Sequence, residues 1–234
     1  MALLRPADPR HPEADPRFPV PWNQGEHVAV IGDTGTGKTT LLTHLVPRRS
    51  AVVVFRTKLD QRIEPKFGRS FKPITKASEM DDLRVDRFVL TPKFEAQGRE
   101  GYAMLERGWK DGGWCIVIDE LWYAERLGLR SAIERLLTQG RSQGVTVVMG
   151  MQRPVQVSRF ALSQATHLFS FRVEGGDVPR MREAFTMQVI PYINADSSTV
   201  IPEHHFVYWH RARRQLAVGT AQSMSRIISE QRSP

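Results

Sequence analysis

The chain has 234 residues, 41% of them hydrophobic and 25% charged, which excludes wholesale disorder and favours one domain with short extensions. Its formal net charge of +8 indicates a polyanionic partner such as nucleic acid. The single Cys115 excludes a disulfide framework, and no apolar run reaches the roughly 18 residues of a membrane span. We therefore expect a cytoplasmic protein without a membrane span.

The two ends of the chain differ in composition from its middle. Residues 1–22 are rich in proline and charge and contain the near-repeat ADPRHPEADPRFP. Proline fits poorly in helix interiors and internal strands, so an extended arm is predicted there. The arm either lies on the surface of its own domain or extends onto a neighbouring subunit. Residues 222–234 are predicted to form a polar tail, which leaves 23–221 as the folded domain.

From Glu26 onward, short apolar runs alternate with longer mixed segments, which is typical of parallel strands connected by helices. The predicted strands are 27–31, 51–55, 87–90, 114–118, 145–151 and 167–171. Helices are predicted at 38–45, 99–106, 129–139 and 178–185. Residues 204–218 are predicted to form a β-hairpin with an arginine-rich turn. The expected fold class is α/β, with a mainly parallel central sheet flanked by helices and a C-terminal β-hairpin.

The first predicted strand runs directly into GDTGTGKT, residues 32–39, and then into an apolar helical segment. This matches G-x-x-x-x-G-K-[ST] between a strand and a helix, the context that a phosphate-binding loop requires. Backbone N–H groups at a helix N-terminus attract anions, and glycine lets that backbone approach closely. ATP is the predicted ligand, and the residues expected to bind it are Gly32, Asp33, Thr34, Gly35, Thr36, Gly37, Lys38, Thr39 and Thr40.

Within this loop, Lys38 is expected to reach the terminal phosphates, and the Thr39 hydroxyl is expected to bind Mg²⁺. The segment WCIVIDE, residues 114–120, supplies carboxylates at the end of a second predicted strand, where ligands bind in open α/β sheets. Asp119 is the predicted magnesium partner, directly or through water. Glu120 is suited to polarise a water molecule for attack on the γ-phosphate, which favours hydrolysis over transfer to a metabolite.

The predicted strand 145–151 has polar residues at both ends. If it lies beside the predicted strands 27–31 and 114–118, Gln152 faces the γ-phosphate. Its amide can then hydrogen-bond both the attacking water and the phosphate. The other interpretation is that Gln152 only caps the strand. Arg141 comes before the strand and therefore lies at the opposite edge of the sheet. It is either a surface residue or reaches into the active site of a neighbouring subunit, with Arg153 as a second candidate.

The segments IGDTGTGKTTLL, CIVIDE, GRSQGVTVVMGMQRP and SQATHLFSFRV together resemble the FtsK and HerA superfamily of DNA-pumping P-loop ATPases. In that superfamily, G-R-x-x-G precedes the penultimate core strand and Q-R-P follows it with this spacing. The resemblance covers roughly residues 26–172. It implies a RecA-like core with an additional strand between the Walker motifs and a hexameric or pentameric ring around double-stranded DNA. It also implies Arg141 as a residue acting in trans and Gln152 as a sensor.

Without a transmembrane anchor, winged helix or nuclease domain, the chain is most similar to genome-packaging ATPases of membrane-containing icosahedral viruses. The implied function is ATP hydrolysis coupled to DNA translocation during viral genome packaging. Capsid or portal proteins are further expected partners, and the expected location is the host cytoplasm or a virion vertex. The alternatives are a plasmid or chromosome DNA-transfer ATPase of the same superfamily and an NTPase that drives protein assembly without DNA. Glu120 disfavours a small-metabolite kinase.

Two secondary features lie outside these motifs. Basic residues between Lys58 and Lys76 either touch DNA phosphates or form a solvated loop. His204, His205 and His210 lie close together in the sequence, but no cysteine or carboxylate spacing supports a metal site. These histidines are therefore assigned to strand packing or to the surface.

Overall fold

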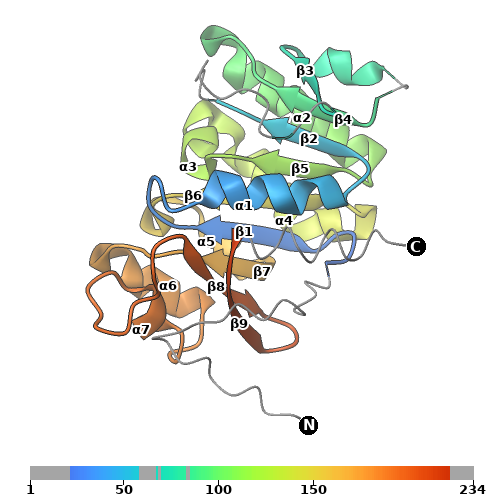
Figure 1. Cartoon of the computed structure of the whole chain (residues 1–234). Helices are drawn as coiled ribbons and strands as arrows, with labels where there is room; N and C mark the ends of the chain where they lie inside the picture. Colours follow the sequence, from blue (N-terminus) through green and yellow to red (C-terminus); the bar gives the residue numbers. More distant parts are fainter. Residues whose placement is uncertain (1–21, 58–66, 68–69, 83–84, 222–234) are drawn as a thin grey trace.

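The structure, a computed structural model, describes residues 22–57, 67, 70–82 and 85–221. The predicted arm, apart from Trp22, and the predicted tail 222–234 lie outside the described residues, as does most of the basic segment between Lys58 and Arg69. The domain boundaries at 22 and 221 therefore stay predictions. Figure 1 shows the described residues arranged around one sheet.

The sheet contains nine strands in the order β3-β4-β2-β5-β6-β1-β7-β8-β9. The strands from β1 to β7 are parallel, and the last two form an antiparallel hairpin along β7. The predicted α/β fold class, with its C-terminal hairpin, is confirmed. The strand bounds are β1 His27–Ile31, β2 Val52–Phe55, β3 Lys72–Ile74, β4 Arg87–Leu90, β5 Cys115–Ile118, β6 Thr146–Met151, β7 Ala165–Ser170, β8 His205–His210 and β9 Gln215–Thr220.

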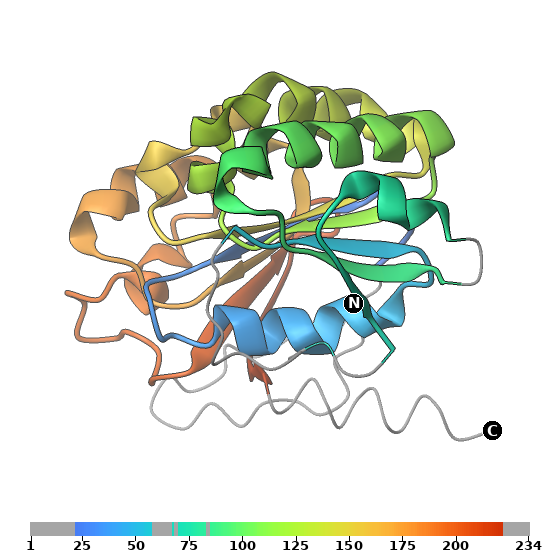
Figure 2. The ribbon, with the colours of Figure 1, turned by 90° about the horizontal axis from the view of Figure 1, so that it is seen from above.

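Helices cover both faces of the sheet, with α1 on one face and α2 and α4 on the other (Figure 2). Short 3-10 turns join many elements, and a π-helical segment, Glu125–Leu129, joins α3 to α4. The helix bounds are α1 Lys38–Leu45, α2 Gln97–Asp111, α3 Leu121–Ala124, α4 Arg130–Gln139, α5 Arg159–Ser163, α6 Val178–Ala184 and α7 Ile190–Ile193.

Alternating side chains of the central strands supply two hydrophobic cores. In β1, Ala29 and Ile31 face the larger core under α2 and α4, whereas Val28 and Val30 face the core under α1. Every residue of β1 is buried, as expected for a parallel strand covered on both faces. This burial explains why the strand is a continuous apolar run rather than an alternating one.

The strand β6 lies between β1 and β5, so it is the additional strand between the two Walker strands. Val30 pairs with Gly150, and Ile118 pairs with Met149. Because all three strands are parallel, their carboxyl ends meet at one edge of the sheet. The segments that follow these strands, beginning at Gly32, Asp119 and Gln152, therefore emerge together.

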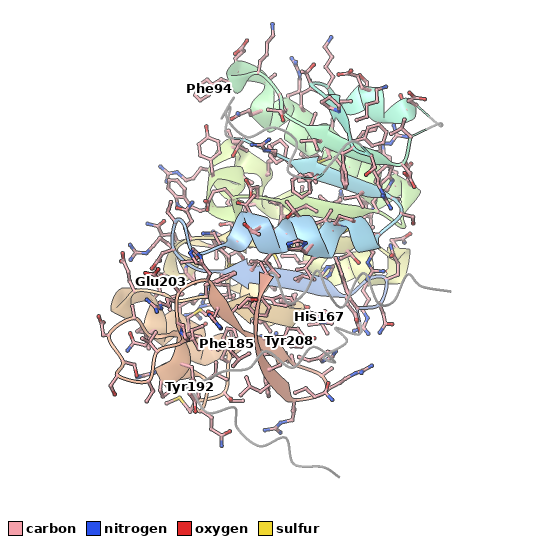
Figure 3. The ribbon with its side chains drawn as sticks, viewed as in Figure 1. Phe94, His167, Phe185, Tyr192, Glu203 and Tyr208 are labelled. Carbon is pink, nitrogen blue, oxygen red and sulfur yellow. The ribbon has the colours of Figure 1, made fainter. Side chains whose placement is uncertain are left out.

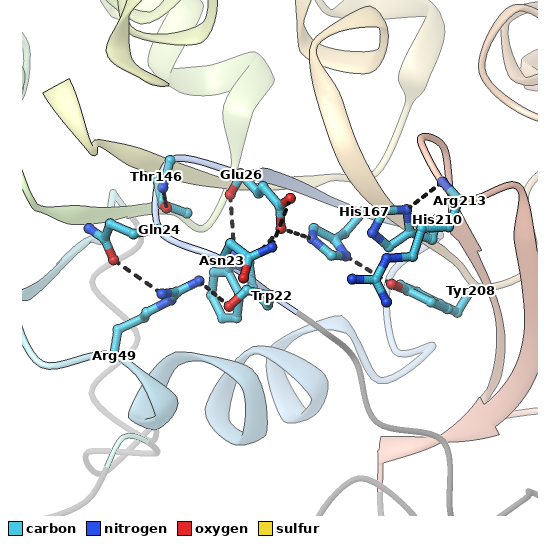
Figure 4. A network of polar contacts seen from close by, with 11 residues as sticks. Trp22, Asn23, Gln24, Glu26, Arg49, Thr146, His167, Tyr208, His210 and Arg213 are labelled. Atoms are coloured by element: carbon cyan, nitrogen blue, oxygen red, sulfur yellow. Dashed lines mark hydrogen bonds and ion pairs between the residues drawn. The ribbon is translucent and has the colours of Figure 1, made fainter. Parts of the chain in front are cut away.

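The chain enters β1 through a polar network at the opposite edge (Figure 4). The Glu26 carboxylate accepts a hydrogen bond from the Asn23 backbone N–H at 2.8 Å and lies 3.0 Å from His167 Nε2. His167 Nδ1 lies 2.8 Å from the Tyr208 hydroxyl. The Arg49 guanidinium lies 4.3 Å from the centre of the Trp22 ring. These contacts fix the start of β1 against β7 and β8, which sets the position of the loop at its other end.

Candidate nucleotide-binding site

The phosphate loop follows β1 and ends at Gly37, the N-cap of α1. Gly37 has φ 111°, a backbone conformation that favours glycine. At Gly32, a Cβ atom would lie only 2.7 Å from the Phe171 Cβ, so a larger residue would push the loop away from β7. The Gly32 N–H donates to the Met151 carbonyl at 3.1 Å, which attaches the loop to the end of β6.

Lys38 is the first residue of α1, and its ammonium lies inside the loop. Its Nζ donates hydrogen bonds to the carbonyl oxygens of Gly32 at 2.6 Å and Asp33 at 2.7 Å. The N–H groups in the first turn of a helix have no partner within the helix and carry partial positive charge. The loop therefore combines an ammonium with helix N–H groups, which is the chemistry needed to bind a polyphosphate.

Asp33, also in the loop, has an altered titration. Burial raises the pKa of its carboxyl above the ordinary value, and the negative charges of Glu174 and Asp177 raise it further. Lys38 and Arg153 oppose this shift.

Asp119 and Glu120 follow β5 directly. Asp119 is half-buried, and its backbone N–H donates to the Phe55 carbonyl at 3.4 Å. The Asp119 carbonyl lies so close to Gly150 that a Cβ atom there would collide with it. The Glu120 side chain is largely buried, with 8% of the residue exposed, and Glu120 is the N-cap residue of α3.

The residues fit Mg²⁺ by the chemistry of their donor atoms. Thr39 offers a hydroxyl from the first turn of α1, and Asp119 offers a carboxylate at the carboxyl end of β5. Both donors are oxygens, which Mg²⁺ prefers in proteins. These two residues would hold the ion together with the phosphates of a nucleotide.

Gln152 contacts the loop and lies in a cavity with Glu120. The Thr34 hydroxyl lies 3.3 Å from the Gln152 Oε1, within hydrogen-bonding distance. Gln152 and Glu120 also line one cavity of about 280 Å³, together with Thr57, Trp122, Tyr123, Arg153 and Gln156. The structure thus gathers the phosphate loop, Glu120 and Gln152 at the same edge of the sheet, and their roles in a nucleotide site stay predictions.

Arg141 lies at the opposite edge, in the turn Gly140–Gln143 that precedes β6. It is exposed, and its backbone packs against Gly25, just before β1. Its side chain forms no hydrogen bond or ion pair with any residue that the structure describes. Arg141 therefore lies at the sheet edge opposite to the one from which its own phosphate loop emerges.

Arg153, the second arginine considered, has partners in its own subunit. Its Nε donates to the Asp177 carboxylate at 2.7 Å, and one of its Nη atoms lies 3.1 Å from Glu174. Asp177 is fully buried and also accepts from the Val155 N–H. Arg153 therefore fixes the segment that follows β6 rather than projecting freely.

Sequence reasoning missed a second cavity, of about 360 Å³, on the β7 side of the loop. It is lined by loop residues 33–36, by Phe171, Arg172 and Ala195, and by the turn 203–205. Nothing in the local sequence marks this turn as part of a site. Only the pairing of β8 with β7 brings it next to the loop.

The sequence is similar to that of a viral packaging enzyme. The chain is 27% identical over 155 residues to the DNA packaging ATPase P9 of Enterobacteria phage PRD1. The match covers 64% of this chain and 66% of that relative, so it spans just under two thirds of the relative's length. The chain matches no family model.

Solved structures share the fold. The genome packaging NTPase B204 from Sulfolobus turreted icosahedral virus 2, in complex with AMP, gives a TM-score of 0.68 at 16% identity, covering 85% of this chain and 98% of that chain. The plasmid coupling protein TrwB, in complex with the non-hydrolysable GTP analogue GDPNP, gives a TM-score of 0.58 at 12% identity, covering 85% of this chain and 86% of that chain.

The similarity to P9 confirms the resemblance to viral packaging ATPases that the motifs indicated. The solved structures share the fold expected from the resemblance to FtsK and HerA-type ATPases. The comparison of folds also confirms the P-loop NTPase architecture. Among the described residues, no helix combines the length and apolar character needed to cross a bilayer.

Proposed function

We propose that this protein is an ATPase that couples ATP hydrolysis to the translocation of double-stranded DNA during viral genome packaging. The observation that supports this most directly is the convergence of the Lys38 loop, Glu120 and Gln152 at one sheet edge, with Thr34 and Gln152 in contact. The similarity to a phage DNA packaging ATPase supports the choice of DNA as the translocated substrate.

In the proposed reaction, Lys38 and the α1 N-terminus bind the phosphates of ATP. Bound Mg²⁺, held by Thr39 and Asp119, would supply positive charge to the phosphate oxygens. Glu120 orients and polarises a water molecule from its position in the cavity that it shares with Gln152. The Gln152 amide donates to the water or to the γ-phosphate and relays the state of that phosphate to the loop through Thr34.

The proposed assembly is a hexameric or pentameric ring in which Arg141 acts on the nucleotide of the neighbouring subunit. Its exposure at the edge away from its own loop supports this role. An arginine supplied in trans stabilises charge on the transferring phosphoryl group. Capsid or portal proteins are the proposed further partners, in the host cytoplasm or at a virion vertex.

The proposal is tested by ATP hydrolysis with and without long double-stranded DNA over a range of salt concentrations. We expect stimulation by duplex at low salt that weakens steeply as salt rises, because phosphate contacts are lost. Lys38→Ala protein serves as the background control. An ATP hydrolysis rate that duplex DNA does not raise at low salt would instead favour an NTPase that drives protein assembly.

A plasmid or chromosome DNA-transfer ATPase is the second candidate, supported by the fold shared with TrwB. DNA stimulation does not separate it from a packaging enzyme. Co-purification with virus capsid components distinguishes the two candidates, because a DNA-transfer ATPase is not expected to bind capsid proteins.

A further inference from the structure

The phosphate loop separates two cavities. The first contains Glu120 and Gln152, whereas the second lies on the β7 side and is bounded by the turn 203–205. We call this second one the β7-side cavity. In Figure 3, Glu203 lies at the sheet edge where the phosphate loop emerges, well away from His167. A triphosphate in the loop whose terminal phosphate faces Glu120 must extend its other end away from that first cavity.

The backbone of His204 is held in an uncommon conformation at the border of the β7-side cavity. His204 has φ 58°, in the left-handed region that residues other than glycine rarely adopt. Such conformations persist where the surrounding structure imposes them, and they cluster at ligand clamps. The His205 N–H donates to the Pro202 carbonyl at 3.2 Å, which closes the turn around His204.

This conformation directs the His204 ring to the start of α1. Its Nδ1 lies 3.4 Å from the Thr36 carbonyl and 3.9 Å from the position that a Cβ atom on Gly37 would take. His204 is nevertheless exposed, so its ring is accessible. A planar aromatic ring thus stands beside the helix N-terminus at which a phosphate would bind.

The other walls of the β7-side cavity are firmly built. Phe171 is buried beneath the loop, where its ring lies 3.3 Å from the position that a Cβ atom on Gly37 would take. The Arg172 Nε donates to the Ile201 carbonyl at 2.7 Å, which ties the end of β7 to the segment before β8. The cavity is therefore lined mainly by segments that the ends of β1, β7 and β8 hold together, and its volume of about 360 Å³ is at the small end of small-molecule sites.

We propose that the β7-side cavity holds the base and ribose of the bound nucleotide, with the His204 imidazole stacking on the base. This inference rests on the proposed nucleotide binding and adds the residue that recognises the nucleoside. Every nucleobase has a π-face, and stacking on an aromatic side chain is favourable for all of them. Glu203, also in the cavity wall, offers a carboxylate that can accept hydrogen bonds from ribose hydroxyls.

The test compares ATP with inorganic tripolyphosphate, which has the phosphates but no nucleoside, by isothermal titration calorimetry. His204→Asn removes the ring while asparagine tolerates the left-handed backbone, and His204→Tyr keeps an aromatic ring. The matched control is Arg214→Asn, because Arg214 is the other non-glycine residue with positive φ among those described and lies on the β8–β9 turn.

We expect His204→Asn to weaken ATP binding about tenfold and to leave tripolyphosphate binding unchanged. His204→Tyr and Arg214→Asn should both bind ATP about as tightly as the unmodified protein. Unchanged ATP affinity in His204→Asn would overturn the inference, and so would an equal loss for ATP and tripolyphosphate, which would assign His204 to loop structure. If the unmodified protein binds neither ligand, the proposed function itself fails.

Discussion

The Thr34 hydroxyl lies 3.3 Å from the Gln152 Oε1, so the phosphate loop and the end of β6 are joined by their side chains. With Oε1 facing the threonine, the amide NH₂ group is left to donate elsewhere. The cavity that Gln152 shares with Glu120 is the space into which it can donate. In the proposed mechanism, this contact transmits a change at the γ-phosphate from Gln152 to the phosphate loop.

Gln152→Ala should lower the hydrolysis rate about 100-fold, because an amide that stabilises the transition state is lost. ATP affinity should change little, since the Lys38 loop is intact. Steady-state hydrolysis and calorimetric ATP binding measure the two effects. Gln156→Ala, a glutamine in the same cavity, is the matched control and should hydrolyse normally. A rate close to normal in Gln152→Ala would leave Gln152 as no more than a strand cap.

Glu120→Gln should bind ATP and hydrolyse it at least about 100-fold more slowly, because the amide cannot act as a general base. Single-turnover measurements of bound ATP and ADP over time show whether ATP is trapped. The control is Glu183→Gln, a carboxylate on α6 outside the cavity. Fast conversion to ADP in Glu120→Gln would contradict its assignment as the base.

Arg141→Ala should fold and bind ATP but hydrolyse it poorly, if Arg141 acts on the neighbouring subunit. Lys38→Ala should lose nucleotide binding or turnover, because it removes the ammonium that lies inside the loop. A mixture of the two variants can place an intact Arg141 beside an intact loop, so turnover should partly return. A mixture no more active than its separate components would count against action in trans.

The strands were largely predictable because the central ones are uninterrupted apolar runs. The predicted ranges of β1, β4 and α1 match the structure, and β2, β5 and β6 each begin one residue later than predicted. The edge strand β3 was missed because it has only three residues and contains Pro73. Proline is tolerated at a sheet edge, and so short a segment has no period to detect.

The helix α2 is much longer than the predicted 99–106. Its glycines lower helix propensity, which hides the helix in the sequence. In the structure these glycines allow close packing: a Cβ atom on Gly108 would collide with Ile116, and one on Gly98 would lie 3.0 Å from the Leu127 carbonyl. Tertiary contacts therefore decide the extent of α2.

The phosphate loop could be found in the sequence because its residues are consecutive. The location of Glu120 and Gln152 at one sheet edge could be predicted because both directly follow predicted parallel strands. The place of His204 beside the loop could not be predicted, because it depends on the antiparallel pairing of β8 with β7 and on its own left-handed backbone. No local pattern in the sequence encodes either feature.

Gly150→Ala should destabilise the protein by about 1–3 kcal/mol and lower hydrolysis, because its methyl group would collide with the Asp119 carbonyl. To avoid this collision, β5 or β6 must shift, and such a shift moves Asp119 and Glu120 relative to the loop. Urea denaturation and steady-state hydrolysis measure the two effects. Gly176→Ala is the control, because a methyl group there would meet its nearest neighbour, Arg153, at an ordinary 3.8 Å. An unaltered free energy of unfolding in Gly150→Ala would show that the ends of β5 and β6 can move apart without a loss of stability.

The polar network that anchors β1 predicts a loss of stability in acid. Burial lowers the pKa of His167 to about 4, although the hydrogen bond to Glu26 opposes this shift, and burial also lowers the pKa of His27 to about 4. As pH falls below 6.5, the two histidines bind protons in the unfolded chain, whereas in the folded protein they stay neutral until the pH approaches 4. The free energy of unfolding should therefore decrease between pH 6.5 and 4, by at most about 3 kcal/mol for each ring.

Glu26 contributes in a different pH window. Burial alone would raise the pKa of its carboxyl, but hydrogen bonds from Asn23 and His167 lower it to about 2. Its stabilisation is present above pH 4.5 and is lost only as pH falls towards 2. Urea denaturation at pH 7.5, 6 and 4.5 therefore measures the contribution of the histidines before the stabilisation by Glu26 is lost. His167→Gln should show a shallower decrease over this range than the unmodified protein, whereas His205→Gln, outside the network, should not. Equal slopes for the His167 variant and the unmodified protein would exclude His167 as a source of the acid sensitivity.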